Sequence, residues 1–254
     1  MTFNIFKALT IDQSKNVVMR GIMVKNSEKF QISIMYSQGI RVEGVTITTP
    51  FNSPNTVGIH IQTTSGASII NSTMATGDDC MSLGTGDINI WIENIRCGPG
   101  HSIAIDSLGE TPRKSIVENV TVSSVVLTGT ENGLRIKTWA NPYNGFVSGI
   151  NFQHAIMKNV RNPIIIDQNY CPNHHNCSKQ SSGIKINGVV FDDVWWSSAT
   201  AMAVTFDYCS RSNPCSGIEL RNVRLTYDGE DKAEAFCRNV EGGSSGLVIP
   251  PSCI

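Results

Sequence analysis

Two adjacent carboxylates, Asp78 and Asp79, form the densest polar cluster of the sequence, in the segment Gly77-Asp-Asp-Cys80. Neighbouring side chains point to opposite faces of a strand, but at a bend between strands both can face solvent. Two carboxylates held close together repel, so one keeps its proton more tightly than the other. Such a pair suits glycoside hydrolysis, in which one carboxyl protonates the leaving oxygen and another activates water. Taken alone, the doublet fits a solvated turn or a calcium-binding loop better.

Further side chains with chemical capacity follow the doublet. His101 comes 23 residues after Asp78, and Arg135 and Lys137 come later, two residues apart. Residues two apart share a face of a strand. Two cations on one face can hold a carboxylate ligand, Arg through a fork of hydrogen bonds and Lys as a point charge. If the steps of a repeat separate these segments, the acids, His101, the cations and the later Tyr170 line one groove.

A repeat of the form apolar-x-apolar-x-(Gly or Asn)-apolar-x-apolar supplies such steps. Copies lie at 17–24, 40–47, 90–95, 117–122, 184–191 and 218–225, with a looser copy around Asn71. The steps between central residues are 23 from Gly21 to Gly44, 23 from Asn71 to Asn94, 25 from Asn94 to Asn119 and 34 from Gly188 to Asn222. The last step fits a coil that carries a longer loop.

The repeat predicts the fold class. A period in the twenties indicates a stacked solenoid, and period-two alternation within each copy indicates strands rather than helices. The central Gly or Asn permits a left-handed bend between two short strands. Leucine-rich repeats have a similar period, but Leu is sparse here, and an ordinary β-sandwich is the remaining alternative. We therefore predict an all-β parallel β-helix with apolar residues stacked inside and Asn side chains stacked at its turns.

Length and composition favour one domain over residues 1–254. Hydrophobic residues make up 40% of the chain, enough for one sizeable core. The net charge of −1 provides no basic field that would attract nucleic acid or an anionic membrane, and no apolar run approaches the roughly 18 residues of a membrane span. The segment Met1-Thr-Phe-Asn lacks the features of a signal peptide, and the repeat begins by Val17. We expect that a signal was removed or that the chain is an internal fragment lacking some N-terminal coils.

The eight cysteines fall mostly as near neighbours. Sequence alone leaves many pairings open, but short local loops are the simplest interpretation and suit an oxidising compartment. Sequons at Asn71, Asn119 and Asn176 agree with secretion. The neighbouring cysteines are Cys80 and Cys97, Cys171 and Cys177, Cys209 and Cys215, and Cys237 and Cys253.

Three other features receive plain interpretations. The segment from Cys171 to Cys177 looks like a zinc site, but its ligands are too cramped to surround one tetrahedral ion, and a small disulfide loop is expected instead. His60 and His154 are interpreted as structural or surface residues, and Asp192-Asp193 as a turn. Trp195 and Trp196 could stack on sugar rings, but adjacent strand residues face opposite ways, so at most one is expected to do so.

Several motifs together resemble the plant polygalacturonases of glycoside hydrolase family 28. The likeness runs from about Phe3 to the C-terminus, with the motifs in family order and at family spacing. The motifs are Asn55-Thr56, Gly77-Asp-Asp-Cys80, Cys97-Gly-Pro-Gly-His101, Ser107-Leu-Gly109, Arg135-Ile-Lys-Thr-Trp139 and Ile164-Ile-Ile-Asp-Gln168. The resemblance implies a right-handed parallel β-helix and hydrolysis of α-1,4-linked polygalacturonic acid, the backbone of pectin, with inversion. It implies no metal and no organic cofactor.

The resemblance also assigns roles by position. Asp78 matches the general acid, Asp79 a water-activating carboxylate, and His101 the histidine that supports the acid. Arg135 and Lys137 match the pair that binds the galacturonate carboxylate. The further positions that match substrate-binding residues are Asn55 and Tyr170. Cys80 and Cys97 match a disulfide that ties the acid coil to the histidine coil.

The chain departs from the family pattern at several positions. Val57 stands where the motif Asn-Thr-Asp has its third catalytic carboxylate, so we expect water activation to rest on Asp79 and the pKa of Asp78 to fall, since one repelling neighbour is gone. Ser102, Ala104 and Asp106 replace a usual Gly, Ser and Gly, and Asp106 would repel a polyanion if it faces the cleft.

These departures leave three functions open. The first is an active endo- or exo-polygalacturonase, and the second is a catalytically impaired homologue that still binds pectin. The third is a rhamnogalacturonan or xylogalacturonan hydrolase on the same scaffold. In each case we expect a secreted, monomeric cell-wall protein whose partner is pectin or polygalacturonic acid, with no nucleic-acid or membrane partner.

Overall fold

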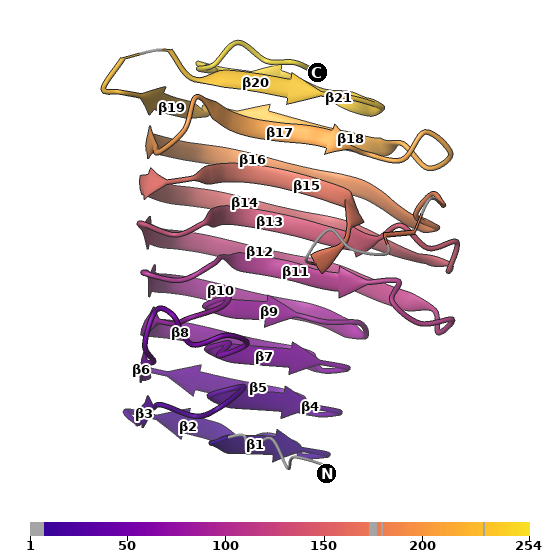
Figure 1. The fold of residues 1–254 in the computed structure, drawn as a ribbon. Coiled ribbons are helices and arrows are strands. Elements are labelled where there is room, and N and C mark those ends of the chain that lie inside the picture. Colours follow the sequence, from indigo (N-terminus) through magenta and orange to yellow (C-terminus); the bar gives the residue numbers. More distant parts are fainter. Residues whose placement is uncertain (1–7, 173–176, 179, 231) are drawn as a thin grey trace.

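The computed structural model describes residues 8–172, 177–178, 180–230 and 232–254, and Figure 1 shows their strands stacked in one continuous column. The strands are β1 (Leu9–Asp12), β2 (Val18–Arg20), β3 (Met23–Lys25), β4 (Ile32–Met35), β5 (Gln38–Glu43), β6 (Thr46–Thr48), β7 (Ile59–Gln62), β8 (Ser65–Ala75), β9 (Met81–Leu83), β10 (Asp87–Cys97), β11 (Ile103–Leu108), β12 (Ser115–Thr128), β13 (Asn132–Trp139), β14 (Gly145–Val160), β15 (Asn162–Tyr170), β16 (Ile184–Ser198), β17 (Met202–Tyr208), β18 (Cys215–Arg221), β19 (Arg224–Tyr227), β20 (Glu234–Cys237) and β21 (Val240–Ser245). Among the described residues no helix is long and apolar enough to cross a membrane.

The strands form two parallel sheets that run the length of the column. One has nine strands in the order β1-β4-β7-β9-β11-β13-β15-β17-β20, and the other has twelve, with β2-β5-β8-β10-β12-β14-β16-β18-β21 as its main path. Each strand pairs with the strand one coil later, as β10 does with β12. The predicted right-handed parallel β-helix is confirmed.

Two columns of left-handed residues bend the strands of the larger sheet. Asn71 and Asn94 have φ near +53° and stack with a 2.7 Å side-chain hydrogen bond, 23 residues apart. In the second column Asn119 donates to Asn89, at 2.6 Å and 30 residues apart. The predicted bends and Asn ladders are thus confirmed, since Asn tolerates positive φ better than most residues.

The predicted steps of 25 and 34 residues are wrong as coil lengths. Glu93 pairs with Ser123 and Arg96 with Val126, which places Asn94 beside Ser124 rather than Asn119. Gly188 likewise lies beside Gly217. In each of these two steps, the two residues belong to different columns of bends. The sequence pattern did not separate the columns, because both contain Gly and Asn residues.

Inward-facing side chains from both sheets fill the interior. The burial of β10 alternates between buried and exposed positions along most of its length, which is the period-two pattern of the sequence. Phe152 and Phe191 stack in successive coils of the twelve-stranded sheet, with ring centroids 5.2 Å apart, and Phe206 of the nine-stranded sheet stacks on Phe191 at 5.9 Å. Burying each such side chain contributes about 1.5–3 kcal/mol, and the stack keeps successive coils in register.

Four disulfides close local loops, as the near-neighbour interpretation predicted. They join Cys80 to Cys97, Cys171 to Cys177, Cys209 to Cys215, and Cys237 to Cys253. The sulfurs of Cys171 and Cys177 are therefore not zinc ligands, while the His residues between them and the Asn176 sequon lie outside the described residues. The Cys80–Cys97 bond ties the segment that carries the acidic doublet to the end of β10.

Candidate functional site

The acidic doublet lies in the tight turn between β8 and β9. The amide of Gly77 donates to the hydroxyls of Thr49 and Thr56, at 3.0 and 3.1 Å. A Cβ at Gly77 would lie 2.1 Å from the carbonyl oxygen of Ser53, so only glycine fits there. These contacts hold the turn against the preceding coil and thereby fix the position of the Asp78 backbone.

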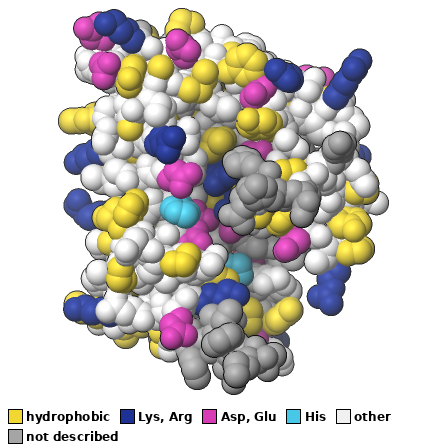
Figure 2. Space-filling model, in the orientation of Figure 1, with side chains coloured by type: hydrophobic (Ala, Val, Ile, Leu, Met, Phe, Trp, Pro, Cys, Tyr) yellow, Lys and Arg dark blue, Asp and Glu magenta, His cyan; other side chains and the backbone are white. Residues whose placement is uncertain are grey.

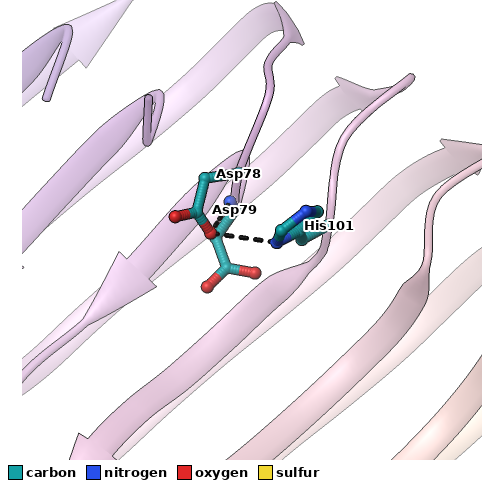
Figure 3. Close-up of side chains that lie close together, drawn as sticks. All are labelled: Asp78, Asp79 and His101. Atoms are coloured by element: carbon teal, nitrogen blue, oxygen red, sulfur yellow. Dashed lines mark hydrogen bonds and ion pairs between the residues drawn. The ribbon is translucent and has the colours of Figure 1, made fainter. Parts of the chain in front are cut away.

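Asp78 pairs with the histidine of the next coil, as Figure 3 shows. Its Oδ1 lies 3.1 Å from Nδ1 of His101, whose Nε2 lies 3.7 Å from Glu131. The hydrogen bond from Asp78 raises the pKa of His101, and the charges of Asp78, Asp79 and Glu131 add to this effect. Burial acts to raise the pKa of Asp78, but the hydrogen bond and charge of His101 outweigh it, so this pKa lies below its usual range. The pair therefore favours an ionised carboxylate beside an imidazolium.

Asp79 lies beneath the surface, with 1% of its area exposed. Its Oδ1 accepts a hydrogen bond from the hydroxyl of Ser102, and its Oδ2 lies 3.1 Å from Nζ of Lys137. Burial raises the pKa of Asp79; Lys137 opposes this shift, while the charges of Asp106 and Asp78 add to it. Ser102 and Lys137 thus occupy both oxygens of Asp79.

The two cations of β13 have different partners. Nζ of Lys137 lies 3.0 Å from Asp106 as well as 3.1 Å from Asp79. Burial acts to lower the pKa of Lys137, but these two carboxylates outweigh it and raise the pKa. Arg135 lies 3.7 Å from Asp167, beyond hydrogen-bond distance, and its buried Nε has no hydrogen-bond partner among the described residues. Lys137 is thus neutralised from two sides, whereas Arg135 faces a single carboxylate, Asp167, and lines the cleft.

Tyr170 covers this cationic pair at the end of β15. The centroid of its ring lies 5.0 Å from Nζ of Lys137 and 5.4 Å from Cζ of Arg135. Trp139 contacts the same ring edge-on, at 5.4 Å. Burial raises the pKa of Tyr170, so its phenol stays neutral and can donate a hydrogen bond.

These side chains line one cleft of about 630 Å³, to which Asn55, Asp78, His101, Arg135, Lys137 and Tyr170 contribute. Asn55 is exposed at the rim, where its φ of +59° turns the chain. A second cavity of about 840 Å³, lined by Asp106, His60 and Glu110, adjoins the cleft at the Asp106–Lys137 ion pair. Figure 2 shows acidic, basic and histidine side chains gathered in the middle of this face. The Asp106–Lys137 ion pair thus joins a lining residue of one cavity to a lining residue of the other.

The acidic trio is suited to moving protons more than to holding a metal ion. One ligand atom each from Asp78, Asp79 and His101 lie within 4.8 Å of one another, which is close enough for a cation. However, the ammonium of Lys137 already contacts Asp79, and the raised pKa of His101 favours an imidazolium, which cannot ligate.

The structure thus places all seven predicted site residues around one cleft, although Asp79 lies under its floor. Three contacts were not predicted: Glu131 beside His101, Asp167 beside Arg135, and the ion pair of Asp106 with Lys137. Glu131 follows His101 by one coil of 30 residues, and its amide donates to the carbonyl of Gly100. A correct coil length at this point would have found it.

Comparison with known proteins finds similar sequences over most of the chain. The family model described as glycosyl hydrolases family 28 matches residues 4–247. The chain is 48% identical over 246 residues to a polygalacturonase of Prunus persica, covering 97% of this chain and 62% of that protein. It is 39% identical to an exopolygalacturonase of Platanus acerifolia, covering 95% and 64%. The chain therefore spans less than two thirds of the length of these relatives.

Two solved structures share the fold. A polygalacturonase from Erwinia carotovora ssp. carotovora superposes with a TM-score of 0.75 at 29% identity, over 93% of this chain and 59% of that one. An endo-xylogalacturonan hydrolase of Aspergillus tubingensis superposes with a TM-score of 0.80 over 94% and 68%, but at 19% identity it bears on the fold alone. None of these similarities supports the alternative of a catalytically impaired homologue.

Proposed function

Because the chain belongs to glycosyl hydrolases family 28, we propose that it hydrolyses the α-1,4-galacturonosidic bonds of polygalacturonate, with inversion. The observation that carries this proposal is the hydrogen-bonded pair of Asp78 and His101 in one cleft with the guanidinium of Arg135. An acid next to a uronate-binding cation is the arrangement that this reaction needs.

The pair of Asp78 and His101 holds the proton that the leaving oxygen receives. With the pKa of Asp78 lowered and that of His101 raised, this proton rests on His101, 3.1 Å from Asp78. As the glycosidic bond breaks, the proton passes from Nδ1 of His101 to Asp78 and from Asp78 to the departing sugar oxygen, which leaves His101 neutral and Asp78 ionised. Glu131, 3.7 Å from the far side of His101, stabilises the imidazolium that supplies it.

Asp79 is proposed to take the proton of the attacking water, whose oxygen bonds to the anomeric carbon from the other face. Only 1% of Asp79 is exposed, so the water must reach it past Ser102 or Lys137. Val57, itself 5% exposed, supplies no second base beside it. Losing one general base typically costs about 10²–10⁴-fold in rate, which is compatible with measurable turnover.

Arg135 is proposed to bind the carboxylate of a galacturonate unit through forked hydrogen bonds. Lys137 offers the carboxylate of the substrate one more hydrogen-bond donor, but it attracts that carboxylate only weakly, because Asp79 and Asp106 neutralise its charge. Asn55 at the rim and Tyr170 over the cations complete the substrate contacts.

A secreted protein acting on the plant cell wall is the setting that we propose. Four disulfides suit an oxidising compartment, and the 48%-identical relative is a plant polygalacturonase. We further propose that the chain is a monomer with one domain over residues 1–254, as expected from its length.

The proposal is tested by product analysis on three defined substrates: polygalacturonate, xylogalacturonan and rhamnogalacturonan. We expect oligogalacturonates from the first and less product from the others. Greater turnover of xylogalacturonan or rhamnogalacturonan would favour the third function named above. A Val57→Asp variant, which restores the family's third carboxylate, is expected to turn polygalacturonate over faster.

A further inference from the structure

Two adjacent tryptophans on β16 are both exposed, although adjacent strand residues were expected to face opposite ways, so that at most one could stack on a sugar ring. Trp195 is 37% and Trp196 50% exposed, and their ring centroids lie 5.3 Å apart. In the ladder Trp196 pairs with Met157 and Leu225, which are both fully buried. Trp196 therefore occupies an inward-facing position, yet its ring lies outside.

A strained backbone turns Trp196 outward. Its φ is +106°, outside the ordinary regions for a residue with a side chain. Such a conformation costs about 1–3 kcal/mol and persists where the surroundings or a function require it. An indole that could be buried in the core and is held at the surface at this cost points to a ligand for that surface.

Trp195 is the middle of a row that runs across successive coils. It pairs with Ile156 on one side and Arg224 on the other, and Ile156 pairs with Val126. Ile156 and Val126 are half-buried, and Arg224 is exposed. Coils stack about 4.8 Å apart, so the row extends over about 14 Å.

This row carries a groove, the tryptophan groove, formed by two cavities that share Trp195. One, of about 330 Å³, lies against Trp196 and Arg224, and the other, of about 300 Å³, lies against Val126 and Ile156. Neither cavity shares a lining residue with the catalytic cleft. The groove belongs to the twelve-stranded sheet, whereas β9, β11, β13 and β15 beside the cleft belong to the nine-stranded one (Figure 1).

The charges of the groove favour an anionic occupant. Lys158 holds its ammonium 5.9 Å from the ring centroid of Trp196, and Arg224 lines the same end. Neither cation forms an ion pair with any residue that the structure describes. The one acid among the lining residues, Asp193, is paired with His154 at 2.9 Å.

We propose that the tryptophan groove binds a second segment of a uronate polysaccharide, away from the catalytic cleft. Aromatic faces pack on the apolar C–H faces of sugar rings, and neither indole N–H donates to another described residue, so both can donate to hydroxyls. Lys158 and Arg224 complement the uronate carboxylates. A groove with cations beside aromatic platforms fits a charged sugar chain better than a flat apolar protein partner.

Affinity electrophoresis through gels with polygalacturonate or neutral galactan tests this proposal. All proteins carry Asp78→Asn, so that the gel is not cut, and Arg135→Ala, so that the cleft binds weakly. We expect Trp195→Ala and Trp196→Gly each to weaken retention by polygalacturonate about five- to tenfold, and galactan to retain all proteins less. Trp91→Ala is the matched control: it is 43% exposed on β10 outside the groove, and its indole is bonded to Glu93 at 3.0 Å.

If the tryptophans only stabilised the fold, their replacement would lower the melting temperature and leave the retention of the folded protein unchanged. Glycine accepts a φ of +106°, so Trp196→Gly should change the melting temperature little while retention falls. Should that variant unfold, the double change Lys158→Gln and Arg224→Gln decides the matter by the same retention measurement. Unchanged retention in the groove variants, or a change in sedimentation in place of retention, would overturn the proposal in favour of a protein contact.

Discussion

Asp106 Oδ1 lies 3.0 Å from Nζ of Lys137, so the lysine is held between two carboxylates, Asp106 and Asp79. One positive and two negative charges leave this part of the cleft with a net charge of −1. The anionic group of a substrate is therefore attracted chiefly by Arg135, which faces one carboxylate, Asp167, rather than two. The sequence predicted that Asp106 would repel a polyanion if it faced the cleft. Asp106 does lie beside the site, and its main effect is to neutralise Lys137 through their ion pair.

Replacing Asp106 should strengthen the binding of acidic sugars. In Asp106→Asn the charge of Lys137 is balanced by Asp79 alone, and a nearby carboxylate ligand gains about tenfold in affinity. The measurement is calorimetric titration with a short oligogalacturonate in an Asp78→Asn background. Glu110→Gln is the control, because Glu110 lines the same cavity as Asp106, whereas the described carboxylates that form ion pairs with Lys137 are Asp79 and Asp106. Equal affinities for the two variants would argue against this role of Asp106.

The proton held by His101 should respond to Glu131. The charge of Glu131 is one of the causes that raise the pKa of His101 above 6.5, so Glu131→Gln should lower that pKa. The stabilisation that His101 gains from its partners is present below its unfolded pKa and is lost as pH rises through the folded value. The loss should therefore begin at lower pH in Glu131→Gln than in the parent.

NMR titration of the His101 ring protons measures this shift without requiring activity. Glu118→Gln removes an equal charge from β12 and should leave the titration unchanged. A pKa of His101 that is the same in the parent and in Glu131→Gln would mean that the 3.7 Å contact carries no electrostatic effect.

The Cys80–Cys97 disulfide should matter for alignment as well as for stability. Its loop spans 17 residues, and that of Cys237–Cys253 spans 16, so replacing either pair by alanine should cost a similar amount, about 3 kcal/mol. Only the first bond ties the acid turn to the coil before His101. We expect both double variants to lose stability in denaturant titrations, and only Cys80→Ala/Cys97→Ala to lose additional turnover in native conditions. Equal losses of turnover would contradict a role in alignment.

The turn before the doublet should not tolerate a methyl group. Gly77→Ala places a Cβ 2.1 Å from the carbonyl oxygen of Ser53, so the turn must shift and carry Asp78 away from His101. Overpacking of this kind costs about 1–3 kcal/mol. Gly243→Ala, where nothing lies within 4 Å of the added Cβ, is the control. Thermal unfolding should distinguish the two, and identical melting temperatures would show that the turn yields without cost.

The parallel β-helix could be predicted because its determinants are local. Alternating apolar residues and left-handed Gly or Asn bends are visible in the sequence, and they form the ladders seen at Asn71 and Asn94. The coil lengths could not be predicted from Asn94 onward, because Asn94 lies beside Ser124 rather than Asn119. Ser can occupy the same left-handed position as Asn, with a φ of +55° at Ser124, but it gives a weaker sequence signal.

The sequence predicted which residues line the site, but it did not predict which of them are buried or form ion pairs with one another. Asp78 and His101 are one coil apart and their contact followed from spacing. Asp79 is buried beneath Ser102, and Asp106 forms an ion pair with Lys137. Both contacts depend on the directions of side chains, which the repeat period and the strand register do not determine. The outward position of the Trp196 side chain could not be predicted either, because it depends on one unusual φ angle.

The release of reducing ends from polygalacturonate tests the central claim most directly. Parent protein should generate them steadily, and Asp78→Asn should abolish the release while leaving the fold intact. Asp192→Asn, which alters the other acidic doublet and keeps an acceptor oxygen for Asn222, should behave like the parent. Release that is equal in the parent and in Asp78→Asn, or no release by the parent, would contradict the assignment of this cleft as the hydrolytic site.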